Sequence, residues 1–403
     1  MRSYKFLLRP TVGQAQALGE MLRDHCSLYN GALEDRKGSY KHRGMSVTYG
    51  EQSAQLKAIR AFDPERQGRW SFSSQQATLR RLDAAMGGFF RRVRNGEKPG
   101  YPRFKPVARF DTVTFPRDGD GCRWDSLPGH ADTRVRFQGV GHVRVRQHRQ
   151  VEGVVKTVSV TREGERWYVV LACDQVPARP LPPTGSMVGI DMGIANFLAD
   201  SNGGFVENPQ HAKVAAEKLA SAQRRLAAFP RKKAQDRTRR HRVAVEKVRS
   251  LHGKLRRQRL DFHHKTALDL VRAHDLIAHE ELAIRSMVRA PKPKPDPKTP
   301  GGFLPNGAAA KAGLNKSILD AGWGGFLSIV TAKAASAGRT TMPVDPRNTS
   351  RTCPECGHVS AENRPDQPTF ACVACGYADH ADTVGAINVL QRAGQAPRQA
   401  TPA

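Results

Sequence analysis

The sequence of 403 residues has no apolar run long enough to cross a membrane, and neither a signal peptide nor a lipidation motif is evident. These absences argue against a membrane anchor and against a secreted, disulfide-stapled protein. Acidic residues are also scarce, because 37 Asp and Glu face 65 Lys and Arg, a formal net charge of +28. Such a chain repels itself unless a polyanion neutralises it, so we expect nucleic acid to be its partner.

Cysteine is infrequent, with seven residues in the whole chain. Three are isolated, and we expect them to be small apolar residues in or near a core: Cys26, Cys122 and Cys173. The other four form two Cys-x-x-Cys pairs separated by fifteen residues: Cys353/Cys356 and Cys372/Cys375. This spacing is typical of a tetrahedral four-thiolate Zn²⁺ site, with two disulfides or a redox pair as the alternatives. Gly357 and Gly376 follow the pairs, where a positive φ would turn backbone amides toward the sulfurs.

The first 185 residues predict a mixed β-barrel with a helical insertion. The segments assigned there are a strand at 3–10, helices around 18–33 and over 73–94, and alternating strands within 133–148 and 153–174. The proline-rich stretch VPARPLPPTGS, residues 176–186, continues neither sheet nor helix and predicts a domain boundary.

The sequence GYPRFK, residues 100–105, interleaves aromatic and basic side chains. Tyr101, Arg103 and Lys105 are candidates for stacking on a base or contacting a phosphate. A turn whose aromatic rings pack within the protein explains the pattern equally well.

Two short apolar strands carry acids. Asp191 lies within MVGIDMGIANFLADSNGGFV, residues 187–206, and HDLIAHEEL, residues 274–282, runs into Glu280 and Glu281. A carboxylate in a buried strand costs free energy unless it is paired or binds a metal ion. The alternative is an aspartate that caps a turn at the end of a strand.

The segments 211–228 and 234–273 predict a helical hairpin broken at Pro230. Residues 224–259 hold 15 Lys or Arg and two acids, which favours a helix that follows phosphates over a merely solvated face. The candidate contacts are Arg239, Arg240, Arg242, Arg256 and Arg259. Six prolines between 291 and 305 predict a flexible insertion.

Taken in order, these features resemble a known family. The motifs that carry the resemblance are YKFLLRPTVGQ, GYPRFK, GIDMGIANF, RLDFHHK, EELAI, LNKSILDAGWGGF, VDPRNTSRTCPECG and FACVACGYADHADTVGAINVL. They are similar to the TnpB family of transposon-encoded RNA-guided nucleases, which is ancestral to the compact type V CRISPR effectors. The resemblance covers nearly the whole chain and implies an α/β multidomain protein with a split RNase H-like (RuvC) nuclease.

The resemblance assigns three catalytic carboxylates: Asp191, Glu280 and Asp382. Glu281 would point to the other face of its strand. Asp379 is a rival to Asp382, and either could instead cap the closing helix. The sequence departs from the family at Val384 and at Arg257, where relatives commonly have Asn.

The resemblance also implies cofactors and partners. Two Mg²⁺ ions, with Mn²⁺ as a substitute, would be held by the carboxylates, and Zn²⁺ would be structural. A guide RNA derived from the transposon end would direct cleavage of double-stranded DNA beside a short motif, in the bacterial cytoplasm at the nucleoid. Alternatives are a nuclease-inactive RNA-guided repressor, a compact type V CRISPR effector and a plain zinc-ribbon nucleic-acid-binding protein.

The implied domains are an N-terminal wedge-like barrel with a helical recognition insertion and a nuclease split by the ribbon. Their expected bounds are 1–185 for the barrel, 186–345 for the nuclease with the basic hairpin, 346–377 for the zinc ribbon, 378–392 for the closing nuclease segment and 393–403 for a disordered tail. Because Asp382 follows the second zinc knuckle by only six residues, we expect zinc to hold this acid in place.

Overall fold

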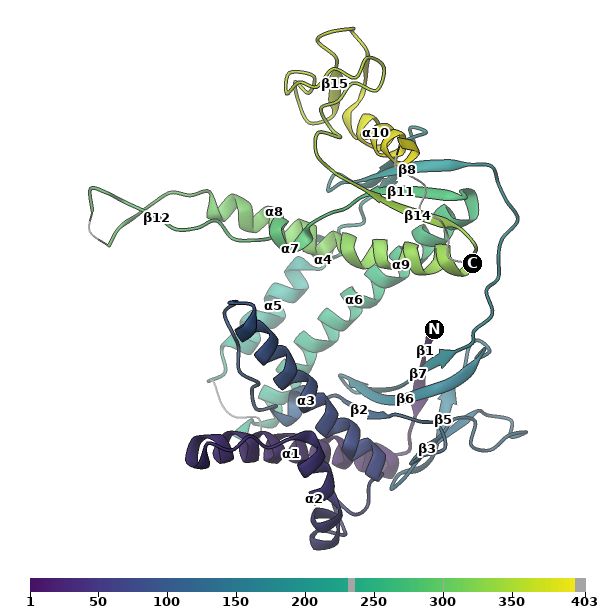
Figure 1. Ribbon diagram of the computed structural model, residues 1–403, viewed down its shortest axis with the longest axis vertical. Coiled ribbons are helices and arrows are strands. Elements are labelled where there is room, and N and C mark those ends of the chain that lie inside the picture. The colour runs from purple at the N-terminus through teal and green to yellow at the C-terminus, as the bar shows by residue number, and fades with distance from the viewer. Residues whose placement is uncertain (231–235, 300, 396–403) are drawn as a thin grey trace. The chain divides into compact units, whose positions relative to one another are not determined.

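A computed structural model describes residues 1–230, 236–299 and 301–395 and divides them into two compact units (Figure 1). The first unit covers Met1–Pro177 together with residues 236 and 237, and the second covers the described residues from Ala178 to 230 and from Thr238 onward. The division therefore falls inside the proline-rich stretch. Within the described residues, no helix combines the length and the apolar character needed to span a bilayer.

The first unit is built on a seven-stranded antiparallel sheet in the order β2-β6-β7-β1-β5-β4-β3. Its strands are β1 (Arg2–Arg9), β2 (Thr112–Phe115), β3 (Cys122–Arg123), β4 (Arg134–Phe137), β5 (Gly141–Arg146), β6 (Val154–Glu163) and β7 (Arg166–Asp174). Apolar and polar residues alternate along most of these strands, so one face of the sheet forms the core.

The sheet curls, but hydrogen bonding does not close it. Its described edge strands, β2 and β3, are not paired with each other. The inward-facing rings of Phe115 on β2 and Phe137 on β4 nevertheless lie 5.4 Å apart between centroids, although four strands separate β2 from β4 in the sheet order. The predicted barrel is thus a strongly curved sheet whose two ends meet through side chains.

Three helices are inserted between β1 and β2: α1 (Val12–Arg43), α2 (Tyr49–Phe62) and α3 (Phe72–Arg94), followed by the short η1 (Val107–Arg109). The prediction for 73–94 matches α3. Helix α2 was not predicted, although Thr48 and Glu51 form a capping box at its start.

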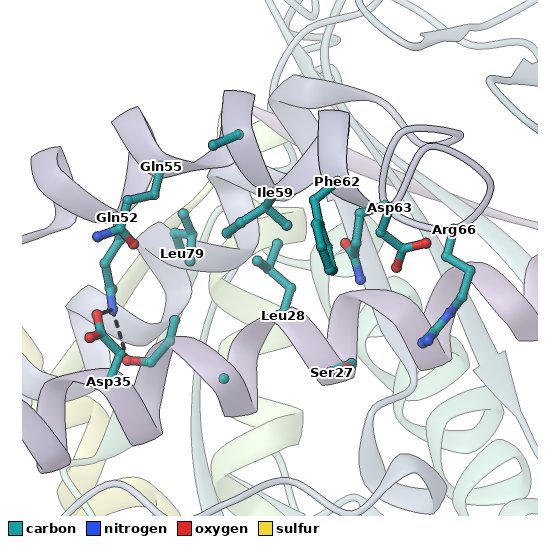
Figure 2. A pocket seen from close by; sticks show the side chains of 14 residues that line it. Ser27, Leu28, Asp35, Gln52, Gln55, Ile59, Phe62, Asp63, Arg66 and Leu79 are labelled. Atoms are coloured by element: carbon teal, nitrogen blue, oxygen red, sulfur yellow. Dashed lines mark hydrogen bonds between the residues drawn. The ribbon is translucent and has the colours of Figure 1, made fainter.

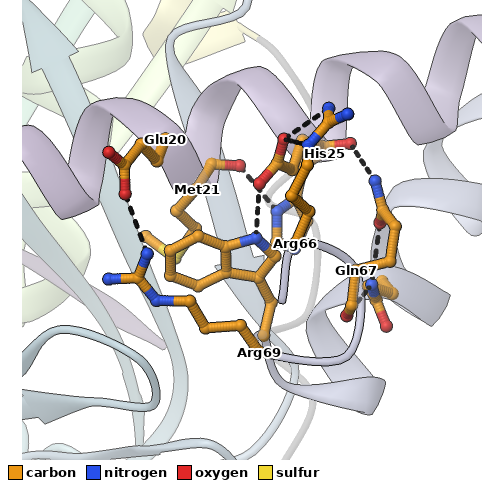
Figure 3. A network of polar contacts seen from close by, with 9 residues as sticks. Glu20, Met21, His25, Arg66, Gln67 and Arg69 are labelled. Atoms are coloured by element: carbon orange, nitrogen blue, oxygen red, sulfur yellow. Dashed lines mark hydrogen bonds and ion pairs between the residues drawn. The ribbon is translucent and has the colours of Figure 1, made fainter. Parts of the chain in front are cut away.

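A polar network ties α1 to the loop that leads into α3 (Figure 3). The buried Asp24 carboxylate accepts hydrogen bonds from Arg66 and, at 2.9 Å, from the Trp70 indole. His25 is fully buried, with one ring nitrogen 2.8 Å from the Met21 carbonyl and the other 2.9 Å from Ser74 Oγ. Burial lowers the pKa of His25 to about 4, so the ring is a neutral structural group.

The second unit contains a mixed five-stranded sheet in the order β10-β9-β8-β11-β14. Its strands are β8 (Met187–Met192), β9 (Asn196–Asp200), β10 (Phe205–Glu207), β11 (Leu276–Glu280) and β14 (Thr340–Val344). The first three form an antiparallel meander, and β8, β11 and β14 are parallel. The parallel strands therefore end at the same edge of the sheet.

Helices cover both faces of this sheet. One face packs on α6 (Arg239–Ala273), α8 (Ala308–Ala321) and α9 (Trp323–Ser336) through a core that includes Val188, Ile277 and Phe326. The other face packs on α10 (Ala381–Gln395). Burial on both sides explains the nearly continuous apolar character of β8 and β11.

The basic segment forms α4 (His211–Val214), α5 (Ala216–Ala227) and α6, with α5 and α6 packed side by side (Figure 1). The Phe229 and His241 rings stack at 4.9 Å near the turn, of which 231–235 lie outside the described residues. After α7 (Ile284–Met287), the proline-rich insertion is not simply irregular: β12 (Lys294–Pro295) pairs with β13 (Phe303–Leu304), with residue 300 not described.

The cysteine-rich segment lies between β14 and α10. It contains β15 (Thr369–Ala371), which pairs with β16 (Ala378–His380), so the ribbon extends past the expected border at 377. Residues 393–395 belong to α10 instead of a disordered tail, and 396–403 lie outside the described residues.

Candidate metal site and its zinc ribbon

Asp191 and Glu280 meet because their strands are parallel neighbours. Ile190 on β8 pairs with His279 on β11, so the next residues, Asp191 and Glu280, stand level with each other and point to the same face. This is the face that α10 covers, at the carboxyl edge of the parallel strands. Glu281 is exposed, and its amide donates to the Val344 carbonyl.

Helix α10 brings the third carboxylate to this edge. A Cβ at Gly189 would lie 2.1 Å from the Ala386 carbonyl oxygen, and one at Gly385 would lie 2.9 Å from Asp191 Oδ2. The two glycines therefore permit close approach of strand and helix. Asp382, in the first turn of α10, is half-buried and its charge acts on Asp191.

Asp379 is arranged differently. It is exposed on β16, where one carboxylate oxygen accepts from the His380 amide at 2.6 Å and the other from the Tyr377 hydroxyl at 3.2 Å. It is not among the charges that shift the pKa of Asp191. The geometry favours Asp382 as the member of the acidic cluster.

The cluster carries more negative charge than its surroundings compensate. Burial raises the pKa of Asp191, and the nearby charges of Glu280 and Asp382 raise it as well, together to about 7. The Arg364 guanidinium and the Met192 amide act in the opposite direction. The three acids are half-buried, and this excess of carboxylate oxygens at one edge of the sheet fits hard divalent cations such as Mg²⁺ or Mn²⁺.

Two partners of the acids were not identified from the sequence. Thr349 Oγ1 lies 2.5 Å from Glu280 Oε1, and Arg364 Nη2 lies 3.4 Å from Asp382 Oδ1. Burial raises the pKa of Glu280, while the Thr349 hydrogen bond and the charge of Arg392 lower it. Both partners belong to the segment between β14 and α10, whose position relative to the sheet has no local sequence signal.

The four cysteines form one compact cluster. Their Sγ atoms all lie within 4.8 Å of one another, with Cys353 3.6 Å from Cys375 and Cys356 3.6 Å from Cys372. These separations exclude disulfides and are close to the ~3.8 Å edge of a tetrahedron with Zn–S bonds of ~2.3 Å. Within the described part of the chain, no other group of three His, Cys, Asp or Glu side chains is gathered this tightly.

The two knuckles are built alike. In each, the first cysteine accepts a backbone hydrogen bond from the following glycine, Gly357 or Gly376, and these glycines have φ of 74° and 76°. The positive φ expected at these positions is therefore present. The residues that follow, His358 and Tyr377, donate backbone amides to Cys356 and Cys375. The donor set fits Zn²⁺, which deprotonates its thiols.

The ribbon and α10 share a small hydrophobic core. Its buried members are Cys353, Cys372, Phe370, Ala381 and Val384. Val384, one of the two expected departures from the family, is fully buried in this core. Val384 thus makes an apolar contact between the ribbon and the turn of α10 that carries Asp382.

The GYPRFK turn packs partly inside the first unit. The Tyr101 ring contacts Phe89 edge-on at 5.1 Å, and the Lys105 backbone exchanges hydrogen bonds with the Asn30 side chain. Arg103 is exposed and Tyr101 is 38% exposed. Their contact with nucleic acid stays a prediction.

The α6 arginines that were predicted to contact nucleic acid fall into two groups. Four are exposed on the helix: Arg239, Arg240, Arg242 and Arg256. Arg259 is half-buried and forms a 2.8 Å ion pair with Asp320 on α8. Asp320 also accepts from the Ala212 amide at 2.9 Å, so Arg259 helps to hold α4, α6 and α8 together.

A separate cavity of about 610 Å³ lies between α1 and α2 in the first unit (Figure 2). Leu28, Ile59, Phe62 and Leu79 make it largely apolar, and Gln52 donates to Asp35 at its rim. The sequence predicts no chemistry for these residues.

The sheet order, the acids at the carboxyl edge and the closing helix define the class of RNase H-like (RuvC) folds. One similar solved structure is titled "Structure of the mini-RNA-guided endonuclease CRISPR-Cas_phi3", with a TM-score of 0.53 and 10% identity over 97% of this chain and 92% of that chain.

Sequence comparisons identify the family within this fold class. The family described as "Probable transposase" (OrfB_IS605) matches residues 153–290, and "Cas12f1-like, TNB domain" matches 323–389. "Putative RNA-guided DNA endonuclease InsQ" of Escherichia coli (strain K12) is 30% identical over 97% of this chain and 92% of its own length. "Putative RNA-guided DNA endonuclease" of Streptomyces pristinaespiralis is 27% identical over 96% of this chain and 88% of its own length. The chain belongs to the TnpB family of transposon-encoded proteins.

Proposed function

We propose that this protein is an RNA-guided DNA endonuclease that hydrolyses phosphodiester bonds with divalent metal ions. The observation that carries the proposal is the acidic cluster of Asp191, Glu280 and Asp382 on three separate elements. A cluster that raises the pKa of its own central acid is costly for folding, and a bound cation offsets that cost. The names of the two bacterial relatives support the same activity.

Each carboxylate has a distinct position for this task. Asp191 lies on β8, the middle strand of the sheet, and the charges of Glu280 and Asp382 both act on it, so the three acids would together hold the ions. Bound ions would supply charge stabilisation and an activated water. Arg364 places a guanidinium beside Asp382, where it would contact the phosphate of the strand being cut.

The ribbon would act on this site through packing. Zinc ligands Cys353 and Cys372 contact the same small core as Ala381 and Val384, which flank Asp382 in sequence. Zinc would therefore fix the first turn of α10 and, with it, the third carboxylate. A direct nucleic-acid contact by the ribbon would be a second role.

The partners would be a guide RNA derived from the transposon end and a double-stranded target with a short adjacent motif. The net charge of +28 and the exposed arginines of α6 support a polyanion along the second unit. The curved sheet and helices of the first unit would read the motif, and base pairing would supply sequence choice.

The test begins with purification of the protein from its native locus and sequencing of the RNA bound to it. The complex is then given a plasmid that carries the matching target, with and without Mg²⁺. We expect Mg²⁺-dependent cleavage that Glu280→Ala reduces by about a thousandfold while target binding is retained, because the loss of several kcal/mol of charge stabilisation affects only chemistry.

Guided binding without cleavage by the unaltered protein would mean a repressor. A bound RNA that comes from a repeat array would place the protein with CRISPR effectors. The absence of any specific RNA would leave a zinc-ribbon nucleic-acid-binding protein and would overturn the proposal.

A further inference from the structure

The carboxylate of Glu280 is held by a hydroxyl group. Thr349, in the loop after β14, is 3% exposed, and its Oγ1 lies 2.5 Å from Glu280 Oε1 and 3.0 Å from the Pro346 carbonyl oxygen. A hydroxyl has a single proton to donate. Because a bond to an ionised carboxylate is the stronger of the two, Thr349 donates to Glu280 when this acid is ionised.

The loop that carries Thr349 is shaped for this contact. Asn348 has φ of 60°, a left-handed conformation that Asn tolerates better than most residues. Its carbonyl accepts hydrogen bonds from the amides of Arg351 and Thr352 at 3.1 and 3.0 Å, which close a tight turn around Thr349. The turn thus fixes the backbone position from which Thr349 reaches Glu280.

Side chains of helix α10 donate hydrogen bonds to the backbone of the same loop. The buried Asn388 donates through Nδ2 to the carbonyl oxygens of Thr349 and Thr352, both at 2.7 Å. Arg392 donates to the Asp345 carbonyl at 2.7 Å. These carbonyls belong to an irregular loop instead of a strand or helix ladder, so α10 supplies their donors.

We propose that Thr349 is a positioning residue for Glu280 and that Asn388 holds it there. The inference rests on the proposed function, because it concerns how one ion ligand is oriented. Its consequence is that α10 acts on the site twice, directly through Asp382 and indirectly through Asn388, Thr349 and Glu280.

A positioning residue matters here because a glutamate carboxylate can rotate about its terminal torsion and present either of its two oxygens. Glu280 ends strand β11, and its terminal torsion is broad, so either oxygen could turn toward an ion. A donor on Oε1 fixes the carboxylate plane and leaves Oε2 for the ion. Supporting hydrogen bonds of this kind are commonly worth ~10–100-fold in metal affinity.

The first experiment compares Thr349→Val with Thr349→Ser in the full chain. Binding of Mn²⁺ is measured at pH 8 by electron paramagnetic resonance of the free ion, and cleavage is measured against Mg²⁺ concentration. We expect Thr349→Val to weaken Mn²⁺ binding about tenfold or more and to raise the Mg²⁺ requirement similarly. Thr349→Ser keeps the hydroxyl and should restore both.

The second experiment tests the helix side with a matched pair. Asn388→Ala removes an amide that supports Thr349, whereas Gln391→Ala removes an exposed amide of the same helix that donates to the Pro354 carbonyl at 3.3 Å. We expect Asn388→Ala to weaken Mn²⁺ binding without touching any carboxylate, and Gln391→Ala to leave it unchanged. Zinc content by elemental analysis confirms that the ribbon is intact in both.

The outcomes separate this inference from the proposed function. If Glu280→Ala weakens Mn²⁺ binding but Thr349→Val binds it like the unaltered protein, the positioning role is wrong while the ion site stands. If Glu280→Ala itself leaves Mn²⁺ binding unchanged, the ion site and the proposed function fail together. Equal weakening in Thr349→Val and Thr349→Ser would mean that the loop is sensitive to any change, and would also overturn the positioning role.

Discussion

Asp24 is a buried aspartate of the first unit and Asp191 a half-buried aspartate of the second, and the charges around them have opposite signs. Asp24 is 4% exposed and accepts hydrogen bonds from the Arg66 guanidinium and the Trp70 indole (Figure 3). Asp191 is surrounded by two more acids, and the nearby cation that lowers its pKa, Arg364, is already paired with Asp382.

Asp24 has the surroundings of a structural acid, and Asp191 has those of a functional one. Around Asp24, the protein supplies donors that satisfy the carboxylate, so the charge stabilises the packing of α1 against the loop before α3. Around Asp191, the protein adds negative charge, which destabilises the fold until a cation arrives. A buried acid by itself is therefore a weak sign of function, and the sign of its neighbours is the informative feature.

The largest expected effect comes from removing zinc. Without the metal, Asp382 would no longer be held beside Asp191, and the excess of negative charge that distinguishes Asp191 from Asp24 would be lost. Cys375→Ser should lose bound zinc and should reduce cleavage nearly as much as Asp382→Ala, because the first turn of α10 packs on the ribbon core. Elemental analysis gives the zinc content, and a plasmid assay gives the cleavage rate.

Asp382→Ala is the control for this change, since it should stop cleavage and keep its zinc. A Cys375→Ser protein that lacks zinc but cuts at the normal rate would refute the idea that the ribbon holds Asp382. In that case the ribbon is an independent module.

A matched pair of substitutions tests whether Asp191 destabilises the fold while Asp24 stabilises it. The raised pKa of Asp191 means that its contribution to stability is present below pH ~4, its unfolded value, and is lost as pH rises toward 7. Asp191→Asn should therefore raise the Tm by a few degrees at pH 8 without added divalent ion, and should have little effect at pH 4. Asp24→Asn should lower the Tm by a few degrees, because donors of Arg66 and Trp70 lose an ionised acceptor worth ~1–3 kcal/mol.

Thermal unfolding followed by circular dichroism at pH 4 and pH 8 gives both shifts. Added Mn²⁺ should stabilise the unaltered protein at pH 8 and leave Asp191→Asn nearly unaffected. If both variants shift the Tm in the same direction at pH 8, the two aspartates are not opposites.

The smallest effect concerns exposed charges on α6. Replacing Arg239, Arg240 and Arg242 with Gln should weaken RNA or heteroduplex binding several-fold at low salt. The slope of log affinity against log salt should fall by roughly 0.7–0.9 for each phosphate that the variant no longer neutralises. Filter binding over a range of salt concentrations measures the slope.

Arg259→Gln is a useful comparison, because Arg259 is already paired with Asp320. It should lower the Tm more than it changes the salt slope. An unchanged slope in the triple variant would mean that the basic face of α6 is only solvated.

The sequence carried the prediction of both acidic strands because their signal is local. The apolar runs that end in Asp191 and Glu280 correspond to β8 and β11, and helix α3 matches its predicted bounds closely. The zinc knuckles were equally readable, since Cys-x-x-Cys followed by Gly determines the turn within six residues. Helix α2 carried a comparable signal in its capping box, Thr48 and Glu51, which a search for apolar periodicity overlooks.

Other features depend on contacts between residues distant in the chain. Sequence spacing left Asp379 and Asp382 as rivals, and only the close packing of α10 on β8 at Gly189 and Gly385 placed Asp382 beside Asp191. The predicted β-barrel is a curved sheet whose described edge strands do not pair, because closure depends on a register that no single strand specifies.

By itself, the sequence determined the chemistry of this protein: a large positive charge, four thiolates at zinc spacing and carboxylates at the ends of apolar strands. Only the tertiary structure decided which groups act on which, namely that Arg259 is paired with Asp320, that Val384 joins the ribbon to α10 and that Thr349 holds Glu280. The physical reason is the distance along the chain over which each kind of interaction acts. Turns, metal spacing and strand patterns are set by neighbours along the chain, whereas ion pairs and supporting hydrogen bonds are set by packing between elements that only folding brings together.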